Sequence, residues 1–243
     1  MAMTFSCSLD DGNPLDMRAA NILKKYALNA TFFIPIKNRE GRKVLGQSDI
    51  RELSHAFEIG SHTFDHCFLK DLSIEDAQYQ VLEGKKKLED ILGREVRGFC
   101  YPGGKYRKEH TALVKAAHFH YARTTTNLRF DTGDDPFEMP TTFQFYAHDR
   151  NVYLRNFIKA GHWMNRHNGL FLALKYDNWI DRLYALFEHS VQHGKVFHLW
   201  GHTKDIDELN AWKEFDQFLQ HVASTVTASN RLTNEQLAKR SFV

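Results

Sequence analysis

Residues 4–12 read T-F-S-C-S-L-D-D-G, an apolar run that ends on two aspartates and a glycine. Its aromatic and aliphatic residues favour a buried strand, and Gly12 allows a sharp turn directly after it. Pro14–Tyr26 follows with the periodicity of a helix, and its proline lies where helices often begin. The start of the chain therefore predicts a strand, a turn that carries two carboxylates, and a helix.

The same alternation continues along the chain. Further strands are expected at Ala30–Pro35, Phe57–Gly60, Val96–Tyr101, His120–Thr124, Val196–Trp200 and Thr225–Ala228. Further helices are expected at Ser48–Ala56, Ser73–Leu92, Lys108–Ala117, Asn151–Arg166, Asn178–His193, Glu208–Ala223 and Asn234–Arg240. Strands that alternate with helices pair in parallel and place the helices outside, so the pattern predicts an α/β fold, either a barrel or a doubly wound sheet. No repeat or linker interrupts the sequence, so residues 1–243 are expected to form one domain.

Composition excludes several classes of protein. The 32 basic and 30 acidic residues nearly balance, which argues against a nucleic-acid partner. No stretch approaches the roughly 18 apolar residues of a membrane span. The N-terminus lacks a basic segment followed by an apolar one, and three cysteines, an odd number, favour reduced thiols. These features predict a cytoplasmic protein without a membrane span.

Polar side chains stand at the ends of the predicted strands. In chain order they are Asp10 and Asp11, then His62 and His66, then Tyr101–Gly104 (Y-P-G-G), then His202. Parallel α/β folds collect functional groups where the strands end and the next loops begin. We therefore expect these side chains at one mouth of the fold.

Two histidines and two carboxylates suggest a metal site. His62 and His66 stand four residues apart in H-T-F-D-H, so one helical turn would direct both imidazoles to one ion. Thr63 occupies the place of the glutamate that a zincin helix uses as its base, so the base must come from elsewhere. Either Asp10 or Asp11 could complete three protein ligands and leave positions open for water and substrate, while the other takes a proton.

The motifs S-L-D-D-G (residues 8–12), H-T-F-D-H with L-K-D-L-S (62–66 and 69–73) and F-C-Y-P-G-G (99–104), in this order, resemble those of the polysaccharide deacetylase family. This family is also known as the NodB-homology or carbohydrate esterase family 4 group. The resemblance covers Thr4–Thr124 and continues more loosely to His202. It implies a distorted (β/α)7 barrel with parallel strands and outer helices.

The resemblance also implies roles for single residues. Asp10 would be the catalytic base, and Asp11, His62 and His66 would hold one divalent metal ion. Zinc is the first candidate, with Co²⁺, Ni²⁺ or Mn²⁺ as alternatives. The backbone N–H of Gly103 would help to stabilise the tetrahedral oxyanion.

The acid and the substrate contacts are expected near the end of the strand V-F-H-L-W-G-H (residues 196–202). His202, at the C-terminal end, is the preferred donor of a proton to the departing amine, and His198 is the alternative. Trp200 and Tyr101 are expected to contact the substrate, with Trp200 as a platform for a sugar ring.

Two positions depart from the family pattern. The third motif often carries an arginine that orients the base, but Phe99–Tyr101 contains none. Arg123, at the end of the next predicted strand, is the candidate replacement. Gly103 stands where an aromatic residue is frequent, which predicts a more open substrate wall.

The resemblance therefore implies a metal-dependent hydrolase that deacetylates an N-acetylated, or alternatively O-acetylated, sugar or polysaccharide through metal-activated water. Such an enzyme acts on carbon–nitrogen (amide) bonds other than peptide bonds. One alternative is hydrolysis of an amide or cyclic imide in a small non-sugar molecule. Another is a carbohydrate-binding module whose catalytic site has decayed. The sequence leaves the particular substrate and the oligomeric state open.

Overall fold

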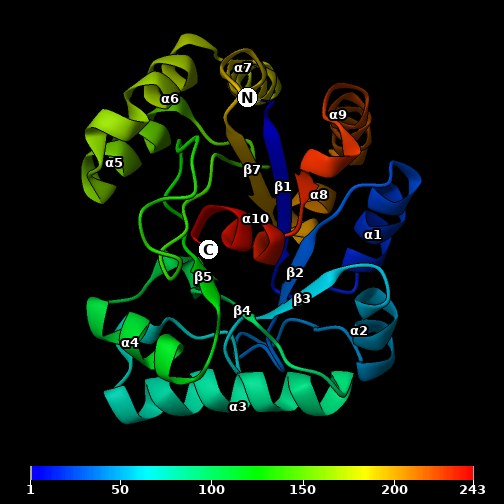
Figure 1. Cartoon of the computed structure of the whole chain (residues 1–243), viewed down its shortest axis with the longest axis vertical. Helices are drawn as coiled ribbons and strands as arrows, with labels where there is room; N and C mark the ends of the chain where they lie inside the picture. The colour runs from blue at the N-terminus through cyan, green and yellow to red at the C-terminus, as the bar shows by residue number, and fades with distance from the viewer. Residues whose placement is uncertain (1, 243) are drawn as a thin grey trace.

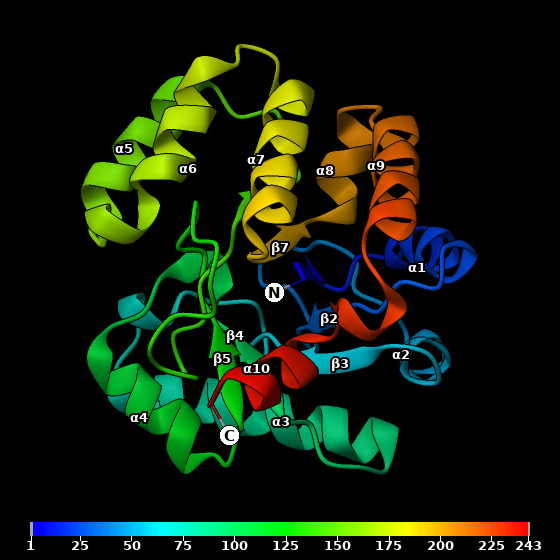
Figure 2. The same ribbon diagram turned by 45° about the horizontal axis from the view of Figure 1, so that its top comes forward.

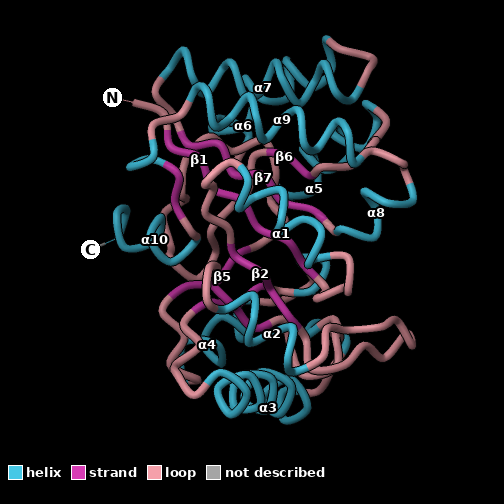
Figure 3. The backbone as a smooth tube through the Cα atoms, turned by 90° about the vertical axis from the view of Figure 1, so that its right-hand side faces the viewer, coloured by secondary structure: helices cyan, strands magenta, loops and turns pink. Residues whose placement is uncertain are grey.

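Helices surround a parallel sheet in the computed structural model of the chain, which describes residues 2–242 (Figure 1). The strands are β1 (Thr4–Asp10), β2 (Thr31–Ile34), β3 (Glu58–Ser61), β4 (Gly98–Cys100), β5 (Tyr121–Arg123), β6 (Phe143–Gln144), β7 (Val196–Gly201) and β8 (Arg231–Leu232). The helices are α1 (Asp16–Lys25), α2 (Gln47–Ser54), α3 (Ile74–Leu92), α4 (Lys108–Ala116), α5 (Arg150–Ala160), α6 (Trp163–Lys175), α7 (Trp179–His193), α8 (Thr203–Glu208), α9 (Trp212–Thr225) and α10 (Asn234–Phe242). Figure 3 shows the strands as an inner layer with helices outside it.

The sheet runs in the order β5-β4-β3-β2-β1-β7-β6, and β8 pairs beside β1. β1 lies in the middle, with Ser8 in register with Thr31 of β2 on one side and Trp200 of β7 on the other. Every residue of β1 is buried, the polar Ser6, Ser8 and Asp10 included. Because all these pairs are parallel, the carboxyl ends of the strands meet on the same side of the sheet.

The segment that joins β5 to β6 closes the sheet toward a barrel. Met139 donates its backbone N–H to Ala122 of β5 at 3.0 Å, and Thr124 donates to Met139 at 2.9 Å. A few residues later, Thr142 donates to the carbonyl of His198 in β7 at 3.0 Å. The connection thus contacts both edges of the sheet, and the prediction of a distorted barrel with outer helices is confirmed.

Helix α10 covers the amino ends of the strands and crosses in front of them in Figure 1. The Glu58 carboxylate accepts hydrogen bonds from Tyr121 Oη (2.5 Å), Thr31 Oγ1 (2.7 Å) and the N–H of Glu235 in the first turn of α10 (3.0 Å). Leu237 completes the contact through an apolar cluster with the side chain of Tyr121. The barrel is therefore closed at this end, and access to its interior comes from the opposite end.

Two predicted helices each divide into two. The helix expected at Asn151–Arg166 is wrong as one element, because Gly161 (φ 68°) and His162 (φ 54°) turn the chain between α5 and α6. The helix expected at Glu208–Ala223 begins only at Trp212, after α8 has ended and Asn210 has taken a left-handed conformation (φ 51°). Local left-handed residues set these boundaries.

The strands near the end of the barrel also differ from the prediction. The strand expected at Thr225–Ala228 is wrong, because α9 extends to Thr225 and β8 pairs with β1 only at Arg231–Leu232. The short strand β6 was not predicted, since two residues are too few to show an alternating pattern.

The cysteines and the helices agree with two further predictions. Cys7, Cys67 and Cys100 are all free and buried, in line with reduced thiols. Within residues 2–242, no helix combines the length and the apolar character needed to traverse a bilayer. The cellular compartment stays a prediction.

Candidate active site

The carboxyl ends of β1 and β3 bring Asp11, His62 and His66 together. Asp11 Oδ1 lies 3.0 Å from His66 Nε2 and 3.5 Å from His62 Nε2. One ligand atom from each of the three residues lies within 4.8 Å of the others. The three side chains suggested by spacing in the sequence therefore converge on a volume that suits one ion.

The histidine pair comes from a loop, and the expectation of a helical turn is wrong. Thr63 (φ 66°) and His66 (φ 56°) adopt left-handed conformations, and Thr63 Oγ1 accepts a hydrogen bond from the N–H of Cys67 at 3.2 Å. Helix α3 packs closely on this loop at Gly84, where an added Cβ would lie 2.8 Å from the carbonyl carbon of Thr63. The tight loop and the glycine contact hold both rings toward Asp11.

The hydrogen bonds of His62 leave a lone pair facing Asp11. His62 Nδ1 lies 2.9 Å from the carbonyl oxygen of Cys100, which can only accept, so Nδ1 carries the proton. In the neutral ring Nε2 is then unprotonated, as in a metal ligand whose other nitrogen is held by a carbonyl. Asp11 Oδ1 is buried and accepts no protein hydrogen bond within the described residues. Two atoms with free lone pairs therefore face each other. Together they fit the ligands of a divalent cation such as zinc.

Asp11 is ionised in this setting. Burial acts to raise its pKa, but hydrogen bonds from the rings of His62 and His66 when Nε2 carries a proton, together with the charge of His202, outweigh burial and hold the pKa well below its usual range. The carboxylate is thus available as a ligand at neutral pH.

Asp10 lies beside Asp11 but has a different partner. Arg123 Nη2 donates a hydrogen bond to Asp10 Oδ1, and the side chains of both residues are almost wholly buried. The guanidinium lies 5.2 Å from the ring centroid of Phe33 and 5.0 Å from that of Trp200. The structure therefore distinguishes the two aspartates, which the spacing alone left equivalent.

The two candidate acids occupy different environments. His198 is buried, and its Nε2 lies 3.0 Å from Ser8 Oγ. Burial and the charge of Arg123 lower its pKa to about 3, so it is neutral. His202 is partly accessible, and its Nδ1 donates to Asp205 Oδ2 at 2.7 Å. Burial acts to lower the pKa of His202, but the bond to Asp205 and the charges of Asp11 and Asp10 raise it to about 9.

The substrate residues expected around Y-P-G-G divide into two groups. Tyr101 is fully buried, stacks on Tyr106 with ring centroids 4.1 Å apart and donates to the carbonyl of Phe137, so its side chain lies in the core. Gly103 has a left-handed backbone (φ 57°), and an added Cβ would lie 2.9 Å from Cε1 of Phe68. Phe68 thus occupies the space above Gly103, and the wall that the sequence predicts to be open carries an aromatic ring from another loop.

Trp200 is nearly buried between two site residues. Its ring faces Arg123 and lies edge-on to His202, with centroids 5.5 Å apart. Only 7% of the residue is exposed, so the expected sugar platform would be limited to an edge of the indole. Its clearest contact is with Arg123.

Two acidic residues of this region were not singled out from the sequence. Asp205, three residues after His202 in α8, holds the imidazole, and the H-T-K-D spacing could have suggested it. Asp16 in α1 is fully buried and accepts a hydrogen bond from Thr203 Oγ1 at 2.6 Å. Burial raises the pKa of Asp16 well above its usual range. No local pattern marks it.

A second group of ligand types lies next to the first. Asp10, His62 and Cys100 also offer atoms within 4.8 Å of one another. Burial raises the pKa of the Cys100 thiol well above its usual value, and Arg123 already pairs with Asp10. This second group is therefore less suited to a cation than Asp11, His62 and His66.

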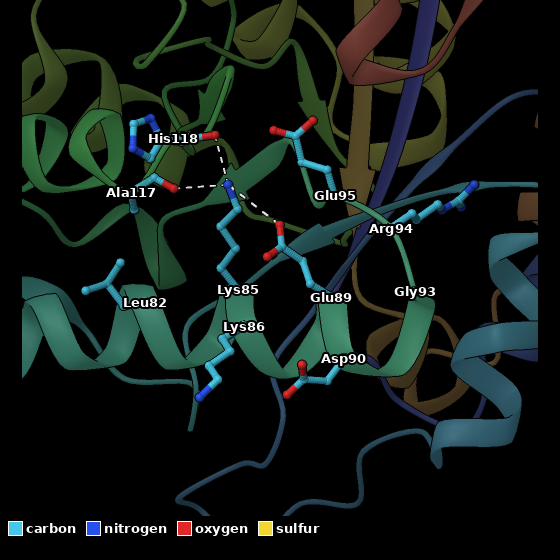
Figure 4. A pocket seen from close by; sticks show the side chains of 10 residues that line it. All are labelled: Leu82, Lys85, Lys86, Glu89, Asp90, Gly93, Arg94, Glu95, Ala117 and His118. Atoms are coloured by element: carbon cyan, nitrogen blue, oxygen red, sulfur yellow. Dashed lines mark hydrogen bonds and ion pairs between the residues drawn. The ribbon is translucent and has the colours of Figure 1, made fainter.

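A surface hollow between α3 and the C-terminal end of α4 lies at the other end of the barrel, beside the residues that lead into β4 (Figure 4). Lys85 is its central cation and donates to the carbonyls of Ala117 (3.0 Å) and His118 (2.9 Å). Glu89 lies 3.7 Å away as its ion-pair partner. Lys85 is thus engaged in capping the C-terminal end of α4.

Comparisons with known proteins identify relatives of this chain. Residues 2–122 match the family model described as polysaccharide deacetylase. A chitooligosaccharide deacetylase from Azorhizobium caulinodans is 37% identical over 111 residues, which are 44% of this chain and 51% of that protein. YxkH from Bacillus subtilis (strain 168) is 28% identical over 120 residues, 49% of this chain and 43% of that protein. The chain thus spans about half the length of the curated relatives it matches.

Solved structures share the fold. The allantoinase Puue superposes with a TM-score of 0.65 at 13% identity, covering 98% of this chain and 89% of its own. The peptidoglycan N-acetylglucosamine deacetylase Bc1960 gives 0.56 at 12% identity, covering 96% and 87%. Likeness at such identities establishes a common fold only. On the match of residues 2–122, about half of its length, this chain belongs to the polysaccharide deacetylase family.

Proposed function

We propose that this chain is a metal-dependent hydrolase that removes the acetyl group from an N-acetylated sugar or polysaccharide. Water would add to the acetyl carbon, the amide C–N bond would break, and acetate and a free amine would leave. Asp11, His62 and His66 would hold one divalent cation, with zinc as the first candidate. The observation that carries the proposal is the contact of two acceptors, His62 Nε2 and Asp11 Oδ1, at 3.5 Å.

A cation held by this set would lower the pKa of a water molecule and polarise the acetyl carbonyl. Asp10 would act as the base, because Arg123 fixes one of its oxygens while the other has only a weak contact at 3.8 Å with Cys100 Sγ. A base that is held in one orientation loses little freedom when it takes the proton. Arg123 is thus proposed as the positioning residue that replaces the missing arginine of the third motif.

His202 would donate the proton that the departing amine needs. Asp205 orients the ring through Nδ1, and this hydrogen bond raises the pKa of His202, which favours the protonated ring at neutral pH. His198, with a pKa of about 3, holds no proton to give under the same conditions. The N–H of Gly103 would contribute a hydrogen bond to the developing oxyanion, an interaction worth about 3–4 kcal/mol in other hydrolases.

Metal content and acetate release, measured on the same samples, test the proposal. The wild-type protein should bind about one divalent ion per chain, as counted for a three-ligand site, and release acetate from acetylated chito-oligomers. Asp10→Asn should keep the ion and lose turnover, whereas Asp11→Asn should lose both. His193→Gln is the matched control and should change neither, because this exposed histidine ends α7 beside the amino end of β7, whereas the site lies at the carboxyl ends of the strands.

Two outcomes would overturn parts of this scheme. Loss of metal in Asp10→Asn with retention in Asp11→Asn would exchange the roles of the aspartates. A wild-type protein without a divalent ion would refute metal-dependent hydrolysis. O-acetylated oligosaccharides, small amides and cyclic imides in the same panel test the alternative substrates, and release from the small amides alone would favour a non-sugar hydrolase.

A further inference from the structure

The hairpin formed by α5 and α6 exposes a set of large apolar side chains. Of nine large hydrophobic residues that are exposed among residues 2–242, five belong to this hairpin. They are Leu154, Ile158, Trp163, Met164 and Phe171, and the last four are 60–87% exposed. Monomeric proteins seldom leave such side chains grouped in water without a use for them.

The same segment has a one-sided charge. Residues 150–175 contain five Lys and Arg residues and no Asp or Glu, although the whole chain is nearly balanced at 32 basic and 30 acidic residues. Arg155, Lys159 and Lys175 are exposed beside the apolar side chains. Arg150 pairs with Asp177 and Arg166 is buried, so these three residues form the local basic surface.

The apolar and basic residues share faces of the two helices. On α6, Trp163, Met164 and Phe171 recur with the spacing of one exposed face, and Lys175 ends it. On α5, Leu154 and Ile158 stand one turn apart, each followed directly by a basic residue. A helix face that combines Trp, Phe and Leu with Lys and Arg has the composition of helices that bind at a lipid interface.

Two buried arginines fix the hairpin in this orientation. Arg166 donates to the carbonyls of Gly161 (2.8 Å) and Phe157 (3.1 Å) at the C-terminal end of α5. Arg182 in α7 donates to the carbonyls of Ala173 and Tyr176, both at 2.8 Å, at the C-terminal end of α6. The hairpin lies at the outer edge of the molecule beside α7 in both ribbon views (Figures 1 and 2). Its apolar face is thus held outward.

We infer that the α5–α6 hairpin docks on an anionic lipid surface. The exposed aromatic and aliphatic side chains would enter the interface, and Arg155, Lys159 and Lys175 would pair with acidic headgroups. A second copy of the chain placed on the same face would bring two basic surfaces together with no acidic residue in either hairpin to compensate. A sugar polymer could stack on the exposed rings of Trp163 and Phe171, but it would find no carboxylate acceptor for its hydroxyl groups in the hairpin. The inference concerns location and does not depend on the proposed hydrolase activity.

Vesicle sedimentation of the full chain tests the inference. Vesicles of phosphatidylcholine mixed with phosphatidylglycerol in equal parts should bind the protein, and vesicles of phosphatidylcholine alone should bind it much more weakly. Trp163→Ser with Phe171→Ser should abolish binding. Arg155→Gln with Lys159→Gln should weaken it by on the order of tenfold and reduce its salt dependence.

A matched control uses exposed residues of the same kinds on α3. Tyr79→Ser with Lys86→Gln and Lys87→Gln removes an exposed aromatic ring and two exposed charges there, and should bind vesicles as the wild type does. Circular dichroism would check that each variant is folded. If the variant with Trp163→Ser and Phe171→Ser does not fold, the variant with Arg155→Gln and Lys159→Gln still tests the inference.

Several results would overturn the inference. They are equal binding to neutral and anionic vesicles, unchanged binding by both hairpin variants, and equal loss in the α3 control. A dimer in sedimentation velocity that the hairpin variants abolish, without vesicle binding, would assign the face to self-association. Retention on an insoluble acetylated polysaccharide that only the hairpin variants lose, again without vesicle binding, would assign it to a sugar polymer.

Discussion

Replacing Arg123 by methionine should destabilise this protein far more than removing a surface arginine, because it leaves a carboxylate buried without its partner. The side chains of Arg123 and Asp10 are 0% and 3% exposed. The guanidinium also lies between the rings of Phe33 and Trp200. Methionine fills much of this volume but offers no hydrogen-bond donor to Asp10.

Removing one partner of a buried ion pair costs about 3–5 kcal/mol, since the remaining charge stays in a poorly solvated site. A domain with a total stability of about 5–15 kcal/mol would lose a large part of it. Arg107→Met is the matched control. Its guanidinium pairs with Glu109 at 2.9 Å, but the Arg107 side chain is 48% exposed, and exposed pairs contribute about 0–1 kcal/mol.

The double variant Arg123→Met with Asp10→Asn separates pairing from packing. It removes both charges, so its loss in free energy of unfolding should fall short of the sum of the two single losses by about 2 kcal/mol. Urea unfolding at neutral pH measures the free energy of unfolding of the wild type, the two single variants and the double variant. A chelator is present throughout to exclude metal binding. Losses that add to within about 0.5 kcal/mol would refute the buried pair as the reason for the effect.

Three further predictions follow from other contacts. Chelation should lower the melting temperature of the wild type, since an ion that binds only the folded state stabilises that state by about 2.7 kcal/mol at roughly 100 times its Kd. Added zinc should restore the melting temperature. In calorimetry, Asp11→Asn should respond neither to the chelator nor to zinc. The pKa of His198 falls from 6.5 to about 3 on folding, so the buried ring remains neutral where the unfolded chain would protonate it. The free energy of unfolding is therefore unaffected by this group above pH 6.5. It decreases by about 1.4 kcal/mol per pH unit as the pH drops from 6.5 toward 3. His198→Gln should flatten this decline in urea unfolding followed from neutral pH to about 4, and an identical slope would contradict the assignment. Gly103→Ala should cost about 1–3 kcal/mol, because φ is 57° and the new Cβ would meet Phe68 at 2.9 Å. Phe68→Ala should relieve part of that loss, and an equal loss in both backgrounds would exclude the steric contact.

The sequence by itself determined the alternation of strands and helices and the carboxyl ends at which polar residues gather. Residues 4–12 show why: a short strand-like run that is bounded by D-D-G, a sequence typical of a turn, places both aspartates at the end of the strand. Boundaries set by single left-handed residues, such as His162 and Asn210, were beyond that pattern, because non-glycine residues give no local sign that they will adopt this conformation. The strand β8 depends on its pairing with β1 and has no pattern of its own.

The resemblance assigned roles to the two aspartates and the strand end favoured His202 over His198, but only the tertiary structure gives each of these residues its partners. Asp10 and Asp11 are neighbours with the same chemistry, yet one faces Arg123 from a strand more than a hundred residues away and the other faces His62 and His66. The pKa values of His198 and His202 also differ, because burial and the charge of Arg123 lower that of His198, whereas the hydrogen bond to Asp205 and the charges of Asp11 and Asp10 raise that of His202. Such differences arise from distances between segments that are remote in the chain, and the order of residues along it does not contain those distances.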